Sequence, residues 1–90
     1  MVIATEISVL PNPFDHYITL EVTCEEHQDC IILLADLSQS KIVRMMGAGL
    51  NAGTNKIRLD DLDPLHPGTY QLDIRTAAGD LLYQTMLIKQ

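Results

Sequence analysis

The feature that most constrains this chain is a two-residue alternation of apolar and polar side chains. In segment 18–24, Ile18, Leu20, Val22 and Cys24 alternate with polar residues, and segment 70–75 repeats the pattern. Successive side chains of a β-strand point to opposite faces of a sheet, so such segments indicate half-buried strands. No window of useful length spaces its apolar residues as a helix would. The chain is therefore expected to be all-β.

Seven segments qualify as strands: 3–9, 18–24, 31–37, 41–46, 56–60, 70–75 and 81–89. Segment 31–37 is almost continuously apolar, which predicts a central strand covered on both faces. Segment 60–68 holds two prolines and predicts a longer loop between two sheets. Short strands with turn signals about every 8–12 residues are typical of an immunoglobulin- or fibronectin-like antiparallel β-sandwich. A small barrel is the structural alternative.

Chain length and charge narrow the class of protein further. Ninety residues predict a single domain spanning 1–90, and a hydrophobic fraction of 47% argues against disorder. The net charge of −6 disfavours nucleic acid and anionic lipid as partners. No apolar run approaches the roughly 20 residues of a transmembrane helix. Met1–Leu10 lacks the basic start of a signal peptide, so the chain is either cytoplasmic, if Met1 is the true start, or a fragment of a longer exported precursor.

The two cysteines, Cys24 and Cys30, are expected at the two ends of a hairpin loop. A disulfide there needs Cα atoms within about 7 Å and an oxidising compartment. Two small buried thiols fit the same spacing equally well. Both interpretations stay open at this point.

Metal binding by Cys24, His27 and Cys30 is a more specific but less favoured hypothesis. Zinc needs three or four converging ligands, and the remaining histidines, His16 and His66, lie in distant turns. Both are most simply exposed turn residues. No metal site and no cofactor are therefore expected.

Calcium binding and nucleophilic catalysis have equally little support. The acidic stretch 60–63 lacks the spacing of a calcium loop. Ser8, Ser38 and Ser40 lack the Gly-x-Ser-x-Gly context of a nucleophile elbow. The chain is expected not to be an enzyme, and an enzyme or metal protein built around Cys24, His27 and Cys30 ranks third among the interpretations.

Several short motifs occur in an order that points to a family. They are Pro11-Asn12-Pro13-Phe14, the turn Ala52-Gly53-Thr54-Asn55, Pro67-Gly68-Thr69-Tyr70, and the ending Leu87-Ile88-Lys89-Gln90. Over nearly the whole chain this pattern resembles the C-terminal sorting domain of the type IX (Por) secretion system of Gram-negative bacteria. Two features depart from the family pattern: Gln39 replaces the usual glycine of an Asp-x-x-Gly turn, and the 60–68 connection is slightly long.

The resemblance implies a non-catalytic signal at the end of a longer secreted protein. Such a domain directs its cargo through translocon components of the outer membrane to the cell surface, where a sorting peptidase removes it. The family places much of the signal in the last strand, which implies recognition through Leu87, Ile88, Lys89 and Gln90. The alternative is a fibronectin-like accessory or adhesion module that binds protein or glycan through an exposed surface.

The motif residues also have physical roles that do not depend on the family. The structural set comprises Pro11, Asn12, Pro13, Phe14, Gly53, Gly68 and Tyr70. The prolines lack a backbone donor and are expected to cap a sheet edge. Phe14 is expected to plug one end of the sandwich, and the glycines to adopt positive φ. Tyr70 is expected to begin a core strand with its hydroxyl bonded back to nearby backbone.

Overall fold

The chain folds into seven antiparallel strands, which we describe from a computed structural model that covers residues 4–90. The strands are β1 (Ala4–Leu10), β2 (Ile18–Cys24), β3 (Gln28–Asp36), β4 (Lys41–Leu50), β5 (Gly53–Leu59), β6 (Gly68–Thr76) and β7 (Leu81–Lys89). The all-β prediction is confirmed. Ile3, where the sequence predicts the first strand to begin, lies outside the described residues.

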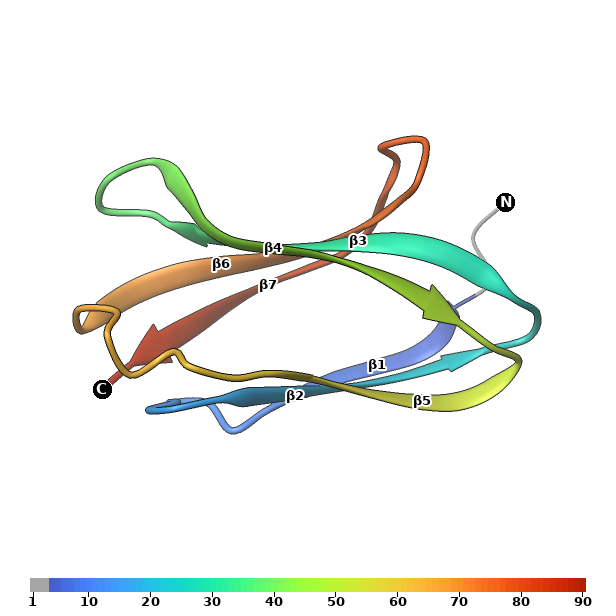
Figure 1. Ribbon diagram of the computed structural model, residues 1–90, viewed down its shortest axis with the longest axis horizontal. Helices are drawn as coiled ribbons and strands as arrows, with labels where there is room; N and C mark the ends of the chain where they lie inside the picture. The colour runs from blue at the N-terminus through green and yellow to red at the C-terminus, as the bar shows by residue number, and fades with distance from the viewer. Residues whose placement is uncertain (1–3) are drawn as a thin grey trace.

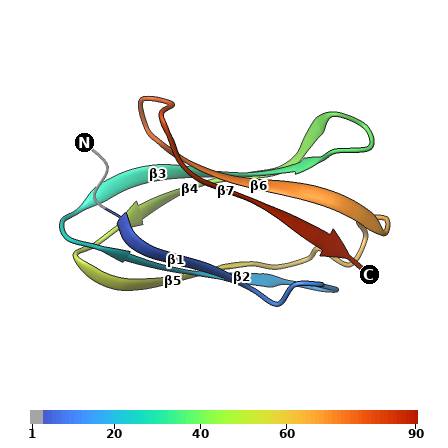
Figure 2. The ribbon, with the colours of Figure 1, turned by 180° about the vertical axis from the view of Figure 1, so that it is seen from behind.

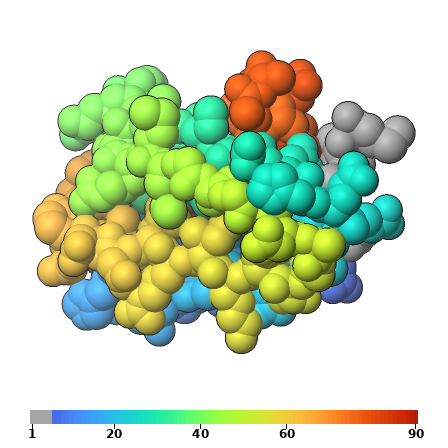
Figure 3. All heavy atoms as spheres, turned by 45° about the vertical axis from the view of Figure 1, so that its right-hand side comes forward, coloured from blue at the N-terminus to red at the C-terminus, as the bar shows by residue number. Residues whose placement is uncertain are grey.

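The strands form two facing layers (Figures 1 and 2). One sheet has three strands in the order β1-β2-β5, and the other has four in the order β4-β3-β6-β7. This is the predicted sandwich, and the barrel alternative is wrong. In the space-filling view the atoms of β4 lie against those of β5 and the segment after it (Figure 3). Arg44 of β4 reinforces this side by donating to the carbonyl of Asp61, at 3.0 Å.

The core lies between the layers and takes every second residue of the central strands. Ile18, Leu20 and Val22 of β2 face Leu72 and Ile74 of β6, and all are at most 1% exposed. Burying one such side chain contributes about 1.5–3 kcal/mol relative to leaving it in water. The period-two alternation in the sequence is therefore the pattern of burial.

The burial of the nearly continuous apolar run in β3 differs from the prediction. The strand is central, since it pairs with β4 on one side and β6 on the other. However, only Ile32 and Leu34 are fully buried, while Ile31 and Leu33 are partly exposed on the outer face. The sandwich has two layers, so nothing in residues 4–90 covers this face. The prediction of a strand covered on both faces is wrong.

The connection between the cysteines is not a hairpin loop, which corrects the sequence prediction. Cys24 pairs with Gly53 in the three-stranded sheet, whereas Cys30 pairs with Ala48 and Thr76 in the four-stranded sheet. The segment between them therefore crosses from one layer to the other. A hairpin and a crossover can have the same length, so spacing alone did not distinguish them. The segment between β5 and β6 also crosses between layers, as predicted.

The β3–β4 turn forms without a glycine. Asp36 Oδ1 accepts hydrogen bonds from the Ser38 amide at 2.9 Å and the Ser38 hydroxyl at 2.7 Å. The left-handed conformation falls on Ser40, with φ of 52°. Gln39 therefore occupies a position that does not require glycine.

Candidate functional site

Motif residues that are far apart in the sequence meet where the chain ends. Gly68 pairs with Lys89 and Tyr70 pairs with Leu87, which joins the start of β6 to the end of β7. Phe14 forms an isolated parallel bridge to Lys89. We call segment 11–14 together with segment 87–90 the terminal-strand site. It lies at the end of the sandwich marked C in Figure 1.

The outer edge of β7 is held by segment 11–14. Asn12 Oδ1 accepts from the Ile88 amide at 3.0 Å, and Asn12 Nδ2 donates to the Met86 carbonyl at 3.3 Å. The Phe14 amide donates to the Ile88 carbonyl at 2.8 Å, and the Gln90 amide donates to the Phe14 carbonyl at 2.9 Å. The Asn12 side chain thus replaces a peptide group of an adjacent strand. The last residues of the chain are held between β6 and this segment.

The predicted edge cap is present, but its hydrogen bonds come from residues other than those expected. β7 is an edge strand of its sheet, and Pro11 and Pro13 flank the residue whose side chain pairs with it. Neither proline has an amide donor to offer a further strand. The hydrogen bonds themselves come from Asn12 and Phe14, which the sequence did not identify as pairing residues.

Two aromatic rings close this end of the core. Phe14 is completely buried, and its ring centroid lies 6.0 Å from that of Tyr70 at an interplanar angle of 68°. This is an edge-to-face arrangement, which adds to the energy of burial. The Tyr70 hydroxyl donates to the His66 carbonyl at 2.7 Å, and burial raises the pKa of that hydroxyl. The predicted roles of Phe14 and Tyr70 are confirmed.

The four tail residues predicted to bind a partner do not share one face. Leu87 is 1% exposed and Lys89 is 6% exposed, because both point into the sandwich. Lys89 Nζ donates to the Gln90 carbonyl at 2.8 Å. Ile88 and Gln90 are exposed instead, and Met86 shares their face by the alternation of the strand. Only Ile88 and Gln90 therefore offer their side chains to a partner.

The second motif turn lies at the opposite end of the molecule. Gly53 has φ of 97° and starts β5, where the chain has crossed over from β4. Asn55 organises this turn: its Oδ1 accepts from the Asn51 amide at 2.9 Å, and its Nδ2 donates to the Asn51 carbonyl at 2.9 Å. Gly68 also has positive φ, at 155°, so the predicted role of both glycines is confirmed.

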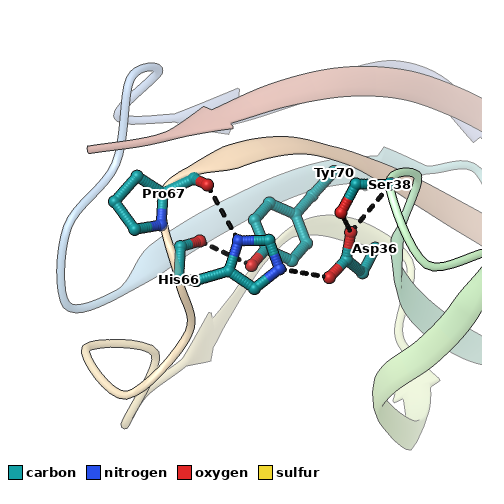
Figure 4. Close-up of polar contacts among 5 residues, drawn as sticks. All are labelled: Asp36, Ser38, His66, Pro67 and Tyr70. Carbon is teal, nitrogen blue, oxygen red and sulfur yellow. Dashed lines mark hydrogen bonds and ion pairs between the residues drawn. The ribbon is translucent and has the colours of Figure 1, made fainter.

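A polar cluster beside the terminal-strand site was missed by the sequence analysis (Figure 4). His66 Nε2 lies 2.6 Å from Asp36 Oδ2, and His66 Nδ1 lies 2.8 Å from the Pro67 carbonyl oxygen. The Asp36 side chain is only 2% exposed, and that of His66 is 47% exposed. His66 is exposed, as the sequence predicts, but it also pairs with the buried carboxylate of Asp36, which the sequence did not indicate. No sequence signal joins the two residues, because β3–β6 pairing brings them together.

Both neighbours of the imidazole accept hydrogen bonds. Each ring nitrogen must therefore donate, which requires the protonated form of His66. The hydrogen bonds to Pro67 and to Asp36 raise the pKa of His66 above its usual value. Hydrogen bonds from Ser38, followed by that from His66, lower the pKa of Asp36. Ser38 donates to the carboxylate and not to the imidazole, so the cluster stabilises a turn and does not pair a nucleophile with a base.

The two cysteines occupy the opposite end of the core. Each is 3% exposed, and both are free thiols in this structure. Burial raises the pKa of both thiols, and that of Cys30 is raised further by the charges of Cys24 and Asp29. Pairing of the two thiols remains a prediction.

Oxidation should convert these thiols into a bond between the sheets. After treatment with oxidised glutathione, we expect the intact mass to fall by about 2 Da and the folded protein to gain about 2 kcal/mol, as a closed loop of this length would give. The Cys30→Ala variant serves as the control, because it cannot form the intramolecular bond. An unchanged mass and two alkylatable thiols after unfolding would favour buried thiols.

The remaining candidate ligands are separate from one another. Among residues 4–90 no group of three or more His, Cys, Asp or Glu side chains is placed to hold a metal ion. His27 lies 3.2 Å from Asp29 and 3.4 Å from Asn51, and Asp60 pairs with Arg58. Within the same range, the structure has no helix of the length and hydropathy needed to span a membrane.

The fold and its closed end define a two-layer, immunoglobulin-like sandwich whose last strand is fixed by segment 11–14. No family model matches the chain, and no curated protein matches it either. Its fold is similar to part of the crystal structure of a selenomethionine-labelled beta-glucosidase from Kluyveromyces marxianus, with a TM-score of 0.54 and 14% identity. The match covers 97% of this chain but only 14% of that one. At this identity the likeness shows the fold alone.

Proposed function

We propose that this chain is a non-catalytic sorting domain of the type IX secretion kind. In this proposal it presents the end of β7 to translocon components, which carry an attached cargo across the outer membrane to the cell surface, and a sorting peptidase then acts on it. The observation that carries the proposal is the convergence of three separate motifs on the end of one strand. Phe14, Gly68 and Tyr70 all contact or pair with segment 87–90.

The surface open to recognition follows from the alternation of β7. Met86 and Ile88 are 56% and 52% exposed, and Gln90 is exposed beside them. β7 is an edge strand, and segment 11–14 bonds only to its last residues, from Met86 onward. The exposed apolar stripe of Met86 and Ile88 suits recognition by a groove, and the edge of β7 before Met86, where segment 11–14 makes no bond, suits strand addition.

Export of a fusion protein tests this proposal. We place residues 1–90 behind a signal peptide and a reporter in a host that has the secretion system, and measure the reporter outside the cells. Deleting Leu87–Gln90 is expected to leave essentially all of the reporter in the periplasm. Replacing both Ile88 and Gln90 with alanine should reduce export strongly without unfolding the domain.

A matched control distinguishes the tail from exposed apolar surface in general. Ile42 and Met45 are 57% and 69% exposed on β4, the opposite edge strand of the same sheet. Replacing both with alanine should leave export unchanged. Equal loss of export in the two double variants would contradict recognition through the tail.

A second candidate function is suggested by the outer face of the four-stranded sheet. Exposed Met45 and Ile42 on β4 pair with the partly exposed Leu33 and Ala35 of β3, which gives this edge of the face an apolar surface. Such a face suits an accessory or adhesion module that binds protein or glycan. In that case binding on a glycan array or to a cell-surface extract should survive removal of Lys89 and Gln90 but fail in the variant lacking Ile42 and Met45.

A further inference from the structure

The polar cluster and the terminal-strand site are parts of one contact network. The Tyr70 hydroxyl donates to the His66 carbonyl, and the Tyr70 ring lies 5.9 Å from the His66 ring and 6.0 Å from that of Phe14. Two residues after His66, Gly68 pairs with Lys89. A displacement of His66 would therefore disturb Tyr70 and Gly68, which pair with the end of β7.

The imidazole is surrounded by groups that favour its charged form. Asp36 reaches it from β3 and the Pro67 carbonyl from its own loop, while Tyr70 lies under it on β6. Lys41 at the start of β4 opposes its charge, and Arg44 of the same strand acts on the neighbouring Tyr70 hydroxyl. Neutral His66 has one N–H, so one of its two nitrogens would then present a lone pair to an acceptor. The protonated imidazole therefore satisfies both contacts, whereas the neutral imidazole satisfies one of them.

We propose that His66 is a pH-operated latch: protonated, it holds the end of β7 in place, and on losing its proton it releases that end. The part such a latch would play in sorting rests on the function proposed above, but the latch itself does not. In the released state the neutral imidazole keeps one of its two hydrogen bonds and loses the other, and the start of β6 loosens. The backbone groups of Leu87 and Lys89, which lie opposite Tyr70 and Gly68 of β6, then become available to a partner strand.

The sign of the pH effect follows from the direction in which the pKa moves. The folded protein raises the pKa of His66, so the stabilisation is fully present below the unfolded value of about 6.5. It is lost as the pH rises through the higher folded value.

Two measurements on the isolated domain test the latch. Proton NMR follows the titration of His66, with the urea-unfolded chain as the reference. Amide exchange of Leu87 and Lys89, which lie opposite Tyr70 and Gly68 of β6, reports release of the strand end when it is divided by the exchange rate of an unstructured peptide at the same pH. We expect His66 to titrate above its value in the unfolded chain, and the exchange of these two amides to accelerate as His66 deprotonates, while the amide of Leu20 in the other sheet does not respond.

The Asp36→Asn variant should reverse the pH dependence. The oxygen of the introduced amide can still accept from Ser38, which turns its NH₂ group toward His66 Nε2, where it suits a neutral imidazole. The latch should then stay closed at alkaline pH and open in acid. Asp63→Asn, which removes an exposed acid from the 60–68 loop, is the matched control and should behave as the unmodified protein does.

The outcomes are decisive for the latch whatever the export assay shows. A His66 titration indistinguishable from that of the unfolded chain, or an Asp36→Asn profile equal to that of the unmodified protein, would overturn it. If Asp36→Asn does not fold, His66→Gln replaces it, with pH-independent exchange expected and an unchanged pH profile counting against the latch. Failure of the tail deletion to block export would overturn the sorting function and leave the latch standing.

Discussion

Replacing Phe14 with alanine is expected to lower the free energy of unfolding by about 3–5 kcal/mol, the usual cost of truncating a buried phenylalanine. The side chain is completely buried and packs edge-to-face against Tyr70. Its loss leaves a cavity at the closed end of the sandwich and removes the anchor that positions segment 11–14 against β7. Urea unfolding followed by circular dichroism measures the change.

Leu10→Ala provides the control for this substitution. Leu10 lies in the same stretch of chain but is 65% exposed, so its truncation should change the unfolding free energy by less than about 0.5 kcal/mol. Phe14→Leu should fall between the two variants, because it refills part of the cavity. A loss below about 1 kcal/mol in Phe14→Ala would mean that the aromatic plug contributes little to the fold.

The second large effect separates two adjacent residues of the tail. Leu87→Ala is expected to cost about 2–4 kcal/mol of stability, since Leu87 is 1% exposed and belongs to the core. Ile88→Ala should change stability by less than about 0.5 kcal/mol, because Ile88 is 52% exposed and faces outward. The effect on export should not follow the effect on stability. Ile88→Ala should reduce export although the domain remains fully folded.

Chemical denaturation and the export assay, applied to both variants, give a direct comparison. Ile42→Ala on the opposite edge strand controls for loss of an exposed apolar side chain, with 57% exposure against 52%. If Ile88→Ala exports normally while Leu87→Ala fails only in proportion to its instability, the tail acts as a structural strand and is not recognised by a partner.

The amino-acid sequence by itself determined the strands and the local roles within them. Alternation in segments such as 18–24 is a local property, so it predicted both the strand and its buried face. Gly53 and Gly68 were identified for the same reason, because a positive φ at one position depends on the residue at that position. Phe14, the only phenylalanine of the chain, was predicted as the plug of the core.

The tertiary structure alone decided which segments meet. Pairing of β3 with β6 brings Asp36 to His66, and the end of β7 lies beside Asn12, whose side chain bonds to residues 74 and 76 positions away. The Cys24–Cys30 segment, which was expected to be a hairpin, is a crossover because its two ends lie in different sheets. These contacts depend on sheet order and register, which are set by the packing of the whole core, and local sequence patterns carry little information about them.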